Sequence, residues 1–124
     1  MISVGILSAT GYMGGEALRV LLDHPEVEIA WLTGRSGGQV ADYHPNFIGL
    51  DLPLIHPSEL TACDVVFLTV PTSATLEAID NLLEQGSRVI DLGSAFRLKD
   101  QAVWERVYGQ SHTHWHLVEE AVYG

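Results

Sequence analysis

A stretch near the amino terminus carries residues suited to binding phosphate. Residues 4–18 read VGILSATGYMGGEAL, and Gly11 and Gly14 stand where an apolar run gives way to a helical pattern. Backbone N–H groups at the start of a helix, together with the helix dipole, favour a diphosphate. Gly11 lets the main chain approach that group without a Cβ, and Gly14 lets the helix lie against the preceding strand. The stretch predicts a dinucleotide-binding turn; the alternative is a pair of glycines that only shape a tight turn.

Ser8 departs from this pattern, because turns of this kind usually begin with glycine. Residues 8–14 (S-A-T-G-Y-M-G, with Thr10 inside) form a variant of G-x-x-G-x-x-G. A side chain at position 8 narrows the turn unless its backbone has a negative φ. The hydroxyl is available to a phosphate oxygen or a nearby N–H group. We expect Ser8 to weaken dinucleotide binding without abolishing it.

The end of the second predicted strand indicates which dinucleotide fits. NAD sites usually carry Asp or Glu about 20 residues beyond the glycines, to accept from the ribose 2′-hydroxyl. Residues 32–36 read L-T-G-R-S and contain no carboxylate. Arg35, with the hydroxyls of Thr33 and Ser36, is suited to a 2′-phosphate. The pattern favours NADP, and the alternative is a solvated arginine on a loop.

Four apolar runs must position these residues. The runs are nearly continuous and contain β-branched residues, so they predict strands covered on both faces. Helical stripes of apolar residues lie between them. This alternation predicts an α/β fold, a Rossmann-like doubly wound parallel sheet, in a single domain over residues 1–124. The runs are residues 2–7, 27–33, 65–70 and 89–92, and the stripes are Met13, Ala17, Leu18, Leu21 and then Leu76, Ile79, Leu82, Leu83.

Local signals place the ends of the helices. His24-Pro25 ends the first helix, and Gly86 ends a second helix over residues 75–85 that Thr72 or Ser73 would cap. Asp100 is the expected N-cap of a helix over residues 101–108. A short strand at residues 52–55 and a helix at residues 58–62 complete the predicted elements.

Charge and cysteine content exclude several classes of partner and site. Sixteen acidic and six basic residues give a net charge of −10, which disfavours nucleic acid and anionic membranes. The apolar runs are shorter than a membrane-spanning helix, and the amino terminus lacks a signal peptide's basic flank. A single cysteine, Cys63, excludes an internal disulfide and multi-thiolate zinc sites. We expect a cytoplasmic protein.

Several segments together resemble N-acetyl-γ-glutamyl-phosphate reductases, and they occur in that family's order and spacing over nearly the whole chain. The resemblance implies the NADP-binding part of an arginine-pathway enzyme that reduces an acyl phosphate with NADPH to a semialdehyde and phosphate. A homo-oligomer is also expected, because a sheet cut before its last strand exposes apolar surface. The segments are SATGYMGGEALRVLLDHPEVEI, LTGRSGG, HPNFIGL, DVVFLTVPTS, VIDLGSAFRLKD and EEAVYG.

The resemblance also implies roles for individual residues. Tyr12 and Met13, with the two glycines beside them, would lie at the pyrophosphate, and Arg35 with Ser36 near the adenosine 2′-phosphate. Others would lie near the nicotinamide, except for the last, which would face the substrate phosphate: Pro71, Thr72, Ser94 and Arg97. Members of the family commonly have histidine at position 72 and serine at position 93, where this chain has Thr72 and Gly93.

The residues that perform the family's chemistry are not in this sequence. Its catalytic cysteine lies in an N-P-G-C-Y-type segment soon after the position of Tyr123-Gly124, and its histidine comes later. We therefore expect no catalytic residue here, and cofactor binding without turnover. Cys63 precedes Asp64, whose carboxylate would raise the thiol pKa, so it is expected to be inert. The alternatives are a fragment of a related aspartate- or aminoadipate-pathway dehydrogenase and a stand-alone non-catalytic nucleotide-binding or regulatory module.

Two further clusters favour structural roles. His112, His114 and His116 would share one face of an extended segment, but no carboxylate or cysteine joins them at a metal-ligand spacing. A solvated or oligomer-facing loop is the preferred interpretation, with no metal site. Trp104 and Tyr108, four residues apart on a predicted helix, are expected to pack in the core or at an interface.

Overall fold

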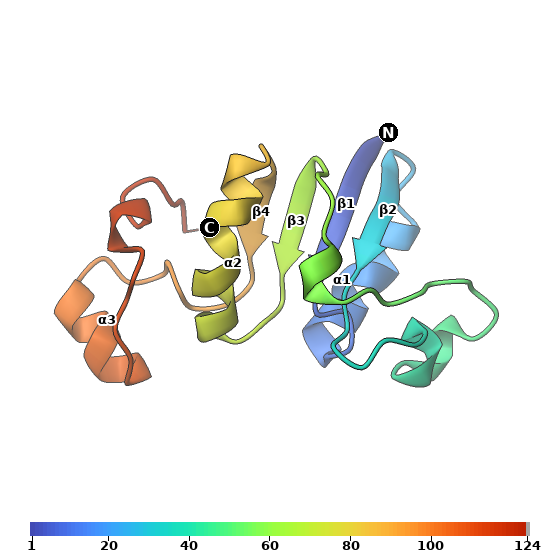
Figure 1. The fold of residues 1–124 in the computed structure, drawn as a ribbon, viewed down its shortest axis with the longest axis horizontal. Helices are drawn as coiled ribbons and strands as arrows, with labels where there is room; N and C mark the ends of the chain where they lie inside the picture. Colours follow the sequence, from blue (N-terminus) through green and yellow to red (C-terminus); the bar gives the residue numbers. More distant parts are fainter. Residues whose placement is uncertain (124) are drawn as a thin grey trace.

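The computed structural model describes residues 1–123 and shows a four-stranded parallel sheet with helices packed on its two faces (Figure 1). The strands run in the spatial order β2-β1-β3-β4, and every neighbouring pair is parallel. The predicted α/β doubly wound sheet is therefore confirmed. The strands are β1 (Ile2–Leu7), β2 (Val27–Leu32), β3 (Val65–Leu68) and β4 (Arg88–Asp91); the α-helices are α1 (Tyr12–Leu22), α2 (Thr72–Glu84) and α3 (Gln101–Tyr108).

The strand order creates a switch point between β1 and β3. From β1 the chain crosses over to β2 on one side, and β3 then returns to pair with the other side of β1. Connections that leave neighbouring strands in opposite directions open a crevice at the carboxyl ends of those strands. The predicted glycine turn follows β1 and therefore lies at this crevice.

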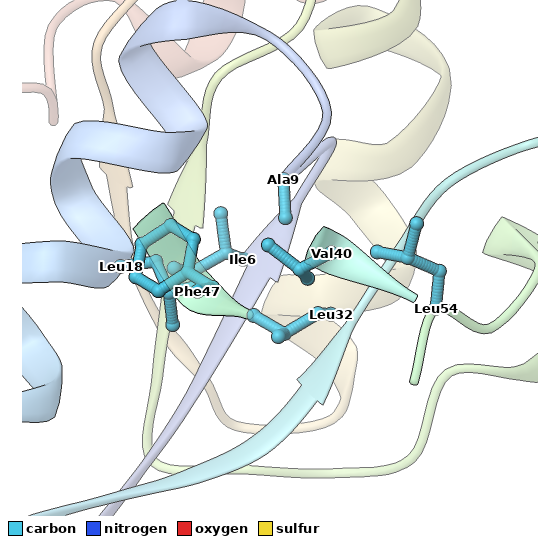
Figure 2. Close-up of a cluster of buried hydrophobic side chains, with 7 residues drawn as sticks. All are labelled: Ile6, Ala9, Leu18, Leu32, Val40, Phe47 and Leu54. Atoms are coloured by element: carbon cyan, nitrogen blue, oxygen red, sulfur yellow. The ribbon is translucent and has the colours of Figure 1, made fainter. Parts of the chain in front are cut away.

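Two hydrophobic clusters cover the two faces of the sheet. Ile6 and Leu7 are neighbours in β1, so their side chains point to opposite faces, and each belongs to a different cluster. Figure 2 shows the first cluster, in which Leu18 of α1 packs with side chains from β1, β2 and the loops that follow. Its fully buried members include Ile6, Ala9, Leu18, Leu32 and Val40.

One glycine within β1 was not singled out by its sequence pattern. A Cβ placed on Gly5 would overlap the indole ring of Trp31, the residue that pairs with Gly5 on the neighbouring strand β2. The Trp31 Nε1 donates to the Thr61 carbonyl oxygen over 2.9 Å, so the ring is held in place. Gly5 is therefore required by packing inside the sheet.

The helix ends agree with the predictions in part. Gly86, with φ of 83°, directly follows the C-cap Gln85 of α2, and Asp100 caps α3 by accepting from the Val103 N–H over 3.0 Å. The predicted caps of α2 are wrong, because the helix begins at Thr72 with Pro71 as its N-cap and no side-chain cap. Pro71 extends the helix toward its amino end because its fixed φ suits a helix start.

Two short elements were predicted with the wrong structure. Residues 52–55 form isolated bridges, Gln39 to Pro53 and Thr33 to Ile55, instead of a strand. Proline lacks the N–H group that a continuing ladder needs, which explains the interruption at Pro53. Residues 58–62 hold only part of the 3₁₀ turn η3 (Pro57–Glu59), whose start is set by a reciprocal cap between His56 and Glu59.

The predicted helical stripes are correct except at their edges. Met13 is 52% exposed and Leu83 is 42% exposed, although both were expected in the core. Both side chains line a groove that is described below. Within residues 1–123, no helix has the length and apolar character needed to cross a membrane.

Candidate functional site

A cleft of about 610 Å³ opens at the carboxyl ends of the strands and brings three separated segments together. The glycine turn after β1, the loop after β2 and the start of α2 after β3 all contribute to its walls. Half of the twelve predicted cofactor-binding residues line this one cleft. They are Ser8, Thr10, Thr33, Arg35, Ser36 and Pro71.

The two glycines of the turn are required for different reasons. A Cβ on Gly14 would overlap the carbonyl oxygen of Ser8 and lie 2.9 Å from the Cα of Ala9, so only glycine lets α1 approach the end of β1. Gly11 is the N-cap of α1 with an ordinary φ of −82°, and a Cβ there would meet no protein atom within 4 Å. Contacts with other protein atoms therefore do not require glycine at position 11.

Ser8 adopts a conformation that the sequence argument had treated as unfavourable. Its φ is 71°, which makes it the one non-glycine residue of the described chain in the left-handed region. Two hydrogen bonds from outside the turn hold Ser8 there: the Ser8 N–H donates to Thr33 Oγ1 over 2.7 Å, and the Ser8 carbonyl accepts from Thr69 Oγ1 over 2.7 Å. The Ser8 side chain itself lines the cleft.

The loop after β2 places its basic and hydroxyl side chains differently. Arg35 and Ser36 are exposed on the cleft wall. Thr33 is 1% exposed, and its hydroxyl oxygen already accepts from the Ser8 N–H. Thr33 therefore joins the end of β2 to the glycine turn.

A second set of predicted residues meets beyond β3 and β4. Thr72 Oγ1 and Ser94 Oγ lie 2.8 Å apart in a hydrogen bond, so the two residues implied near the nicotinamide are neighbours. The backbone carbonyl of Ser94 accepts from Trp104 Nε1 over 3.0 Å, which fixes this loop to α3. The predicted packing of Trp104 against Tyr108 is confirmed, with ring centroids 5.1 Å apart.

A larger groove of about 1210 Å³ runs along β4, α2 and the carboxyl-terminal segment. Arg97 lies on this groove and not on the cleft of Arg35. Its Nε donates to the Gly93 carbonyl over 2.8 Å, an Nη donates to the Leu92 carbonyl over 3.2 Å, and the guanidinium stands 5.8 Å from the ring centre of Tyr123. Gly124, the second residue of the expected Tyr123-Gly124 pair, lies outside the described residues.

Asp91 belongs to the same groove and was not predicted as a site residue. Its Oδ1 accepts from the Gly93 N–H over 2.8 Å, and its Oδ2 is buried without a partner in the described part of the chain. Burial raises the pKa of the Asp91 carboxyl, against smaller opposing effects of the Gly93 N–H and the Arg97 charge. The sequence feature that could have identified Asp91 as a site residue is its position at the end of β4, because polar groups at the carboxyl ends of parallel strands gather at this edge of the sheet.

Comparison with known families identifies the fold around these clefts. The family model described as semialdehyde dehydrogenase, NAD binding domain, matches residues 3–123. The chain belongs to this family. The glycine turn, the cleft and the Thr72–Ser94 pair all lie within the matched residues.

Curated relatives make the resemblance more specific. N-acetyl-γ-glutamyl-phosphate reductase of Neisseria meningitidis serogroup C (strain 053442) is 47% identical over 128 residues, covering 99% of this chain and 37% of the relative. The enzyme of the same name from Nitrosospira multiformis is 45% identical over 129 residues, covering 100% of this chain and 38% of the relative. The resemblance predicted from sequence segments is confirmed, and the chain spans 37% to 38% of the length of these two relatives.

Solved structures agree with the fold. Aspartate semialdehyde dehydrogenase with NADP from Candida albicans superposes with a TM-score of 0.64 at 24% identity, covering 82% of this chain and 32% of that one. Aspartate semialdehyde dehydrogenase II complexed with ASA from Vibrio cholerae gives a TM-score of 0.59 at 20% identity, covering 80% and 33%. At these identities the likeness shows a shared fold.

The cysteine of this NAD-binding domain is buried, as expected of an unreactive thiol. Cys63 is 8% exposed, and burial is the largest of the effects that raise the pKa of its thiol. The charge of Asp64, which the sequence argument named, contributes in the same direction as a smaller effect. The thiol donates to the Val65 carbonyl over 3.5 Å.

The histidine-rich segment is structural at its first position, which corrects the expectation of a solvated loop. His112 is 5% exposed, donates from Nε2 to the Ala95 carbonyl over 2.8 Å and packs edge-on to Trp104. His114 bonds Asp80 of α2 over 2.7 Å, whereas His116 is exposed. Within residues 1–123 no three His, Cys, Asp or Glu side chains are grouped as metal ligands.

Proposed function

We propose that this chain is the NADP-binding portion of an N-acetyl-γ-glutamyl-phosphate reductase. The observation that carries the proposal is the single cleft in which the glycine turn, the Arg35 loop and the end of β3 meet. The identity of 45% to 47% with enzymes of that name supports the choice within the semialdehyde dehydrogenases. Residues 1–124 would form one dinucleotide-binding domain in a cytoplasmic enzyme.

Two parts of the cofactor would be held by different groups. The pyrophosphate would lie over the first turn of α1, from Gly11 to Gly14, where backbone N–H groups lack helical partners and no side chain caps the helix. Arg35, with Ser36 and the Thr33 hydroxyl, would hold the 2′-phosphate of NADP. The open space around Gly11 fits such a ligand, because protein atoms leave it unfilled.

The remaining predicted residues fit the reacting end of the cofactor. Thr72 and Ser94, which are hydrogen-bonded to each other, would lie beside the nicotinamide with Pro71. Arg97 lies on the groove along β4 and would face the phosphate of the substrate, whereas Met13, which is assigned to the pyrophosphate, lines the same groove and not the cleft. The Arg97 guanidinium is oriented by the carbonyls of Leu92 and Gly93, which leaves its other Nη to bind an anion.

The proposed reaction of the whole enzyme is reduction of N-acetylglutamyl 5-phosphate to the semialdehyde and phosphate in arginine biosynthesis. A thiolate must displace phosphate from the acyl group, and bound NADPH supplies the hydride that reduces the resulting thioester. In this chain, Cys63 is buried and its thiol pKa is raised, so it does not fit the role of that thiolate. We propose that the 124-residue chain binds cofactor and substrate phosphate without turnover.

The groove along β4 supports the proposal that the protein forms homo-oligomers. Its walls include the exposed apolar side chains of Met13, Leu83, Ile90 and Val122. Exposed apolar patches of this kind favour association. Sedimentation velocity tests this directly, and a monomer at all accessible concentrations would contradict it.

Titration of the chain with NADPH and NADH tests the assignment of the cofactor. Arg35→Ala should weaken NADPH binding by about 10- to 100-fold, because it removes charge-assisted hydrogen bonds to the 2′-phosphate, and should leave NADH binding unchanged. Arg88→Ala is the matched control, since it removes the same charge at the first residue of β4, which lies at the opposite edge of the parallel sheet from the cleft. Unchanged NADPH affinity in Arg35→Ala, or an equal loss in Arg88→Ala, would overturn the assignment.

A further inference from the structure

His44 lies far from the glycine turn in sequence but contacts it directly. Its Nε2 donates to the carbonyl oxygen of Ala9 over 2.9 Å, across 35 residues. The imidazole also fills the space above Gly15 in the first turns of α1, where an added Cβ would lie 2.7 Å from ring atoms Cε1 and Nε2. The ring is therefore wedged between the turn and the helix that begins after it.

The segment that carries His44 is anchored in the core. His44 stands between two 3₁₀ turns, η1 (Val40–Asp42) and η2 (Pro45–Phe47). Its backbone N–H donates to Val40 over 2.9 Å, and its carbonyl accepts from Phe47 over 3.0 Å. Val40 and Phe47 are 1% and 4% exposed and pack in one cluster with Ala9, as Figure 2 shows.

With the bond from His44, the backbone N–H and carbonyl groups of Ser8 and Ala9 are all hydrogen-bonded within the protein. The Ser8 N–H and carbonyl bond the hydroxyls of Thr33 and Thr69. The Ala9 N–H donates to the Thr33 carbonyl over 3.0 Å, and the Ala9 carbonyl accepts from His44. His44 is thus the last of the contacts that fix this part of the turn.

The Ala9 carbonyl and the Thr10 N–H belong to one planar peptide unit. In a trans peptide these two groups point in opposite directions, and the described chain has no cis peptide. Holding the Ala9 carbonyl against His44 therefore directs the Thr10 N–H to the side opposite the imidazole. Thr10 lines the cleft, and a phosphate lying against the turn would need a backbone donor of this kind.

We propose that His44 is a positioning residue for the dinucleotide, which orients the phosphate-binding N–H groups of the turn through the Ala9 carbonyl. The inference rests on the proposed binding of NADP in the cleft. It assigns His44 to the pyrophosphate end of the ligand, whereas Arg35 acts on the 2′-phosphate. The two roles can be separated with a nucleotide that carries the 2′-phosphate but no pyrophosphate.

The test compares NADPH with adenosine 2′-monophosphate, which lacks the pyrophosphate, by calorimetry and NMR titration of the chain. His44→Leu removes the donor and should weaken NADPH binding about tenfold, as expected for one lost hydrogen bond, while the affinity for adenosine 2′-monophosphate stays unchanged. His44→Gln keeps an N–H donor at similar reach and should restore most of the NADPH affinity. His116→Leu, at an exposed histidine of η4 (Trp115–Leu117), is the matched control and should bind like wild type.

A second variant displaces the imidazole of His44 without substituting the histidine. Gly15→Ala places a methyl group against the imidazole, so it should displace His44 and lower NADPH affinity selectively even if His44→Leu unfolds. Leucine and glutamine variants that bind NADPH equally, or equal losses for both ligands, would overturn the positioning role. A wild-type chain that binds neither NADPH nor NADH would overturn the proposed function itself, and this inference with it.

Discussion

The two arginines at the carboxyl ends of the strands occupy opposite situations. Arg35 stands exposed on the wall of the cleft beside the glycine turn. Arg97 lies on the groove along β4, where two of its nitrogens already donate to the carbonyls of Leu92 and Gly93. The guanidinium of Arg97 is oriented by nearby backbone carbonyls, whereas that of Arg35 is exposed on the cleft wall.

The same contrast extends to the two hollows. At the cleft, the side chains of Thr33, Thr69 and His44 form hydrogen bonds to backbone groups of the glycine turn. No side chain caps the start of α1. The groove contains side chains that interact with one another or with nearby backbone, such as Asp91 with the Gly93 N–H. A site built from fixed backbone donors is suited to an invariant phosphate group, whereas a site of oriented side chains is suited to a particular substrate.

Substitution of the two glycines is expected to separate packing from ligand binding most strongly. Gly14→Ala should lower the free energy of unfolding by about 1 to 3 kcal/mol, because the new Cβ overlaps the Ser8 carbonyl, and should abolish NADPH binding. Gly11→Ala should cost less than about 1 kcal/mol, the loss expected at an N-cap, yet weaken NADPH binding about tenfold or more. Urea unfolding and NADPH titration measure the two quantities.

The contrast between these variants carries its own control. Gly11→Ala has space for its methyl group, so any loss of NADPH affinity in a stably folded variant reports on the ligand. Equal stability losses in both variants would mean that Gly11 also serves packing. Unchanged NADPH affinity in Gly11→Ala would place the pyrophosphate away from the turn.

Sequence patterns predicted the cleft more completely than the groove, and the reason is physical. Strands, glycines and the Arg35 loop follow from local periodicity and from residue types within about 30 positions of one another, as in other dinucleotide folds. The left-handed φ of Ser8 and the bond from His44 to Ala9 depend on contacts across 25 and 35 residues, which local patterns do not encode. The same holds for Asp91, because its residue type and local pattern do not show that the carboxyl is buried in the folded chain.

Ser8 offers a smaller but more specific test of the cleft. Ser8→Gly should raise the free energy of unfolding by about 0.5 to 1 kcal/mol, since it relieves a left-handed serine at a modest cost in chain entropy. NADPH affinity should rise, because glycine widens the turn on the cleft side. The measurements are again urea unfolding and titration with NADPH.

A serine with ordinary backbone provides the comparison. Ser111 is exposed and does not have a positive φ, so Ser111→Gly should leave stability unchanged or lower it. A loss of NADPH affinity in Ser8→Gly would show that the hydroxyl of Ser8 contributes a bond to phosphate that outweighs the strain.

Substitution of Asp91 is expected to have the smallest effect. It tests whether the buried carboxylate in the groove lowers the free energy of unfolding. Burial raises its pKa above the ordinary 3.8, so the folded protein binds its proton more tightly than the unfolded chain does. Stability should therefore fall as pH rises from about 3.8 through the raised pKa of Asp91, and stay level above it. Asp91→Asn removes this dependence, so the stability difference between variant and wild type should grow in favour of the variant over that pH window.

Only the change of this difference with pH reports on the ionisation, because any fixed cost of the amide cancels between two pH values. Urea unfolding of both proteins between pH 4 and pH 8, about the range in which small domains stay folded, supplies the comparison. Asp23→Asn, at the exposed C-cap of α1, removes the same charge without burial and should show no such trend. A flat difference for Asp91→Asn would mean that Arg97 and the Gly93 N–H fully offset the burial of the carboxylate.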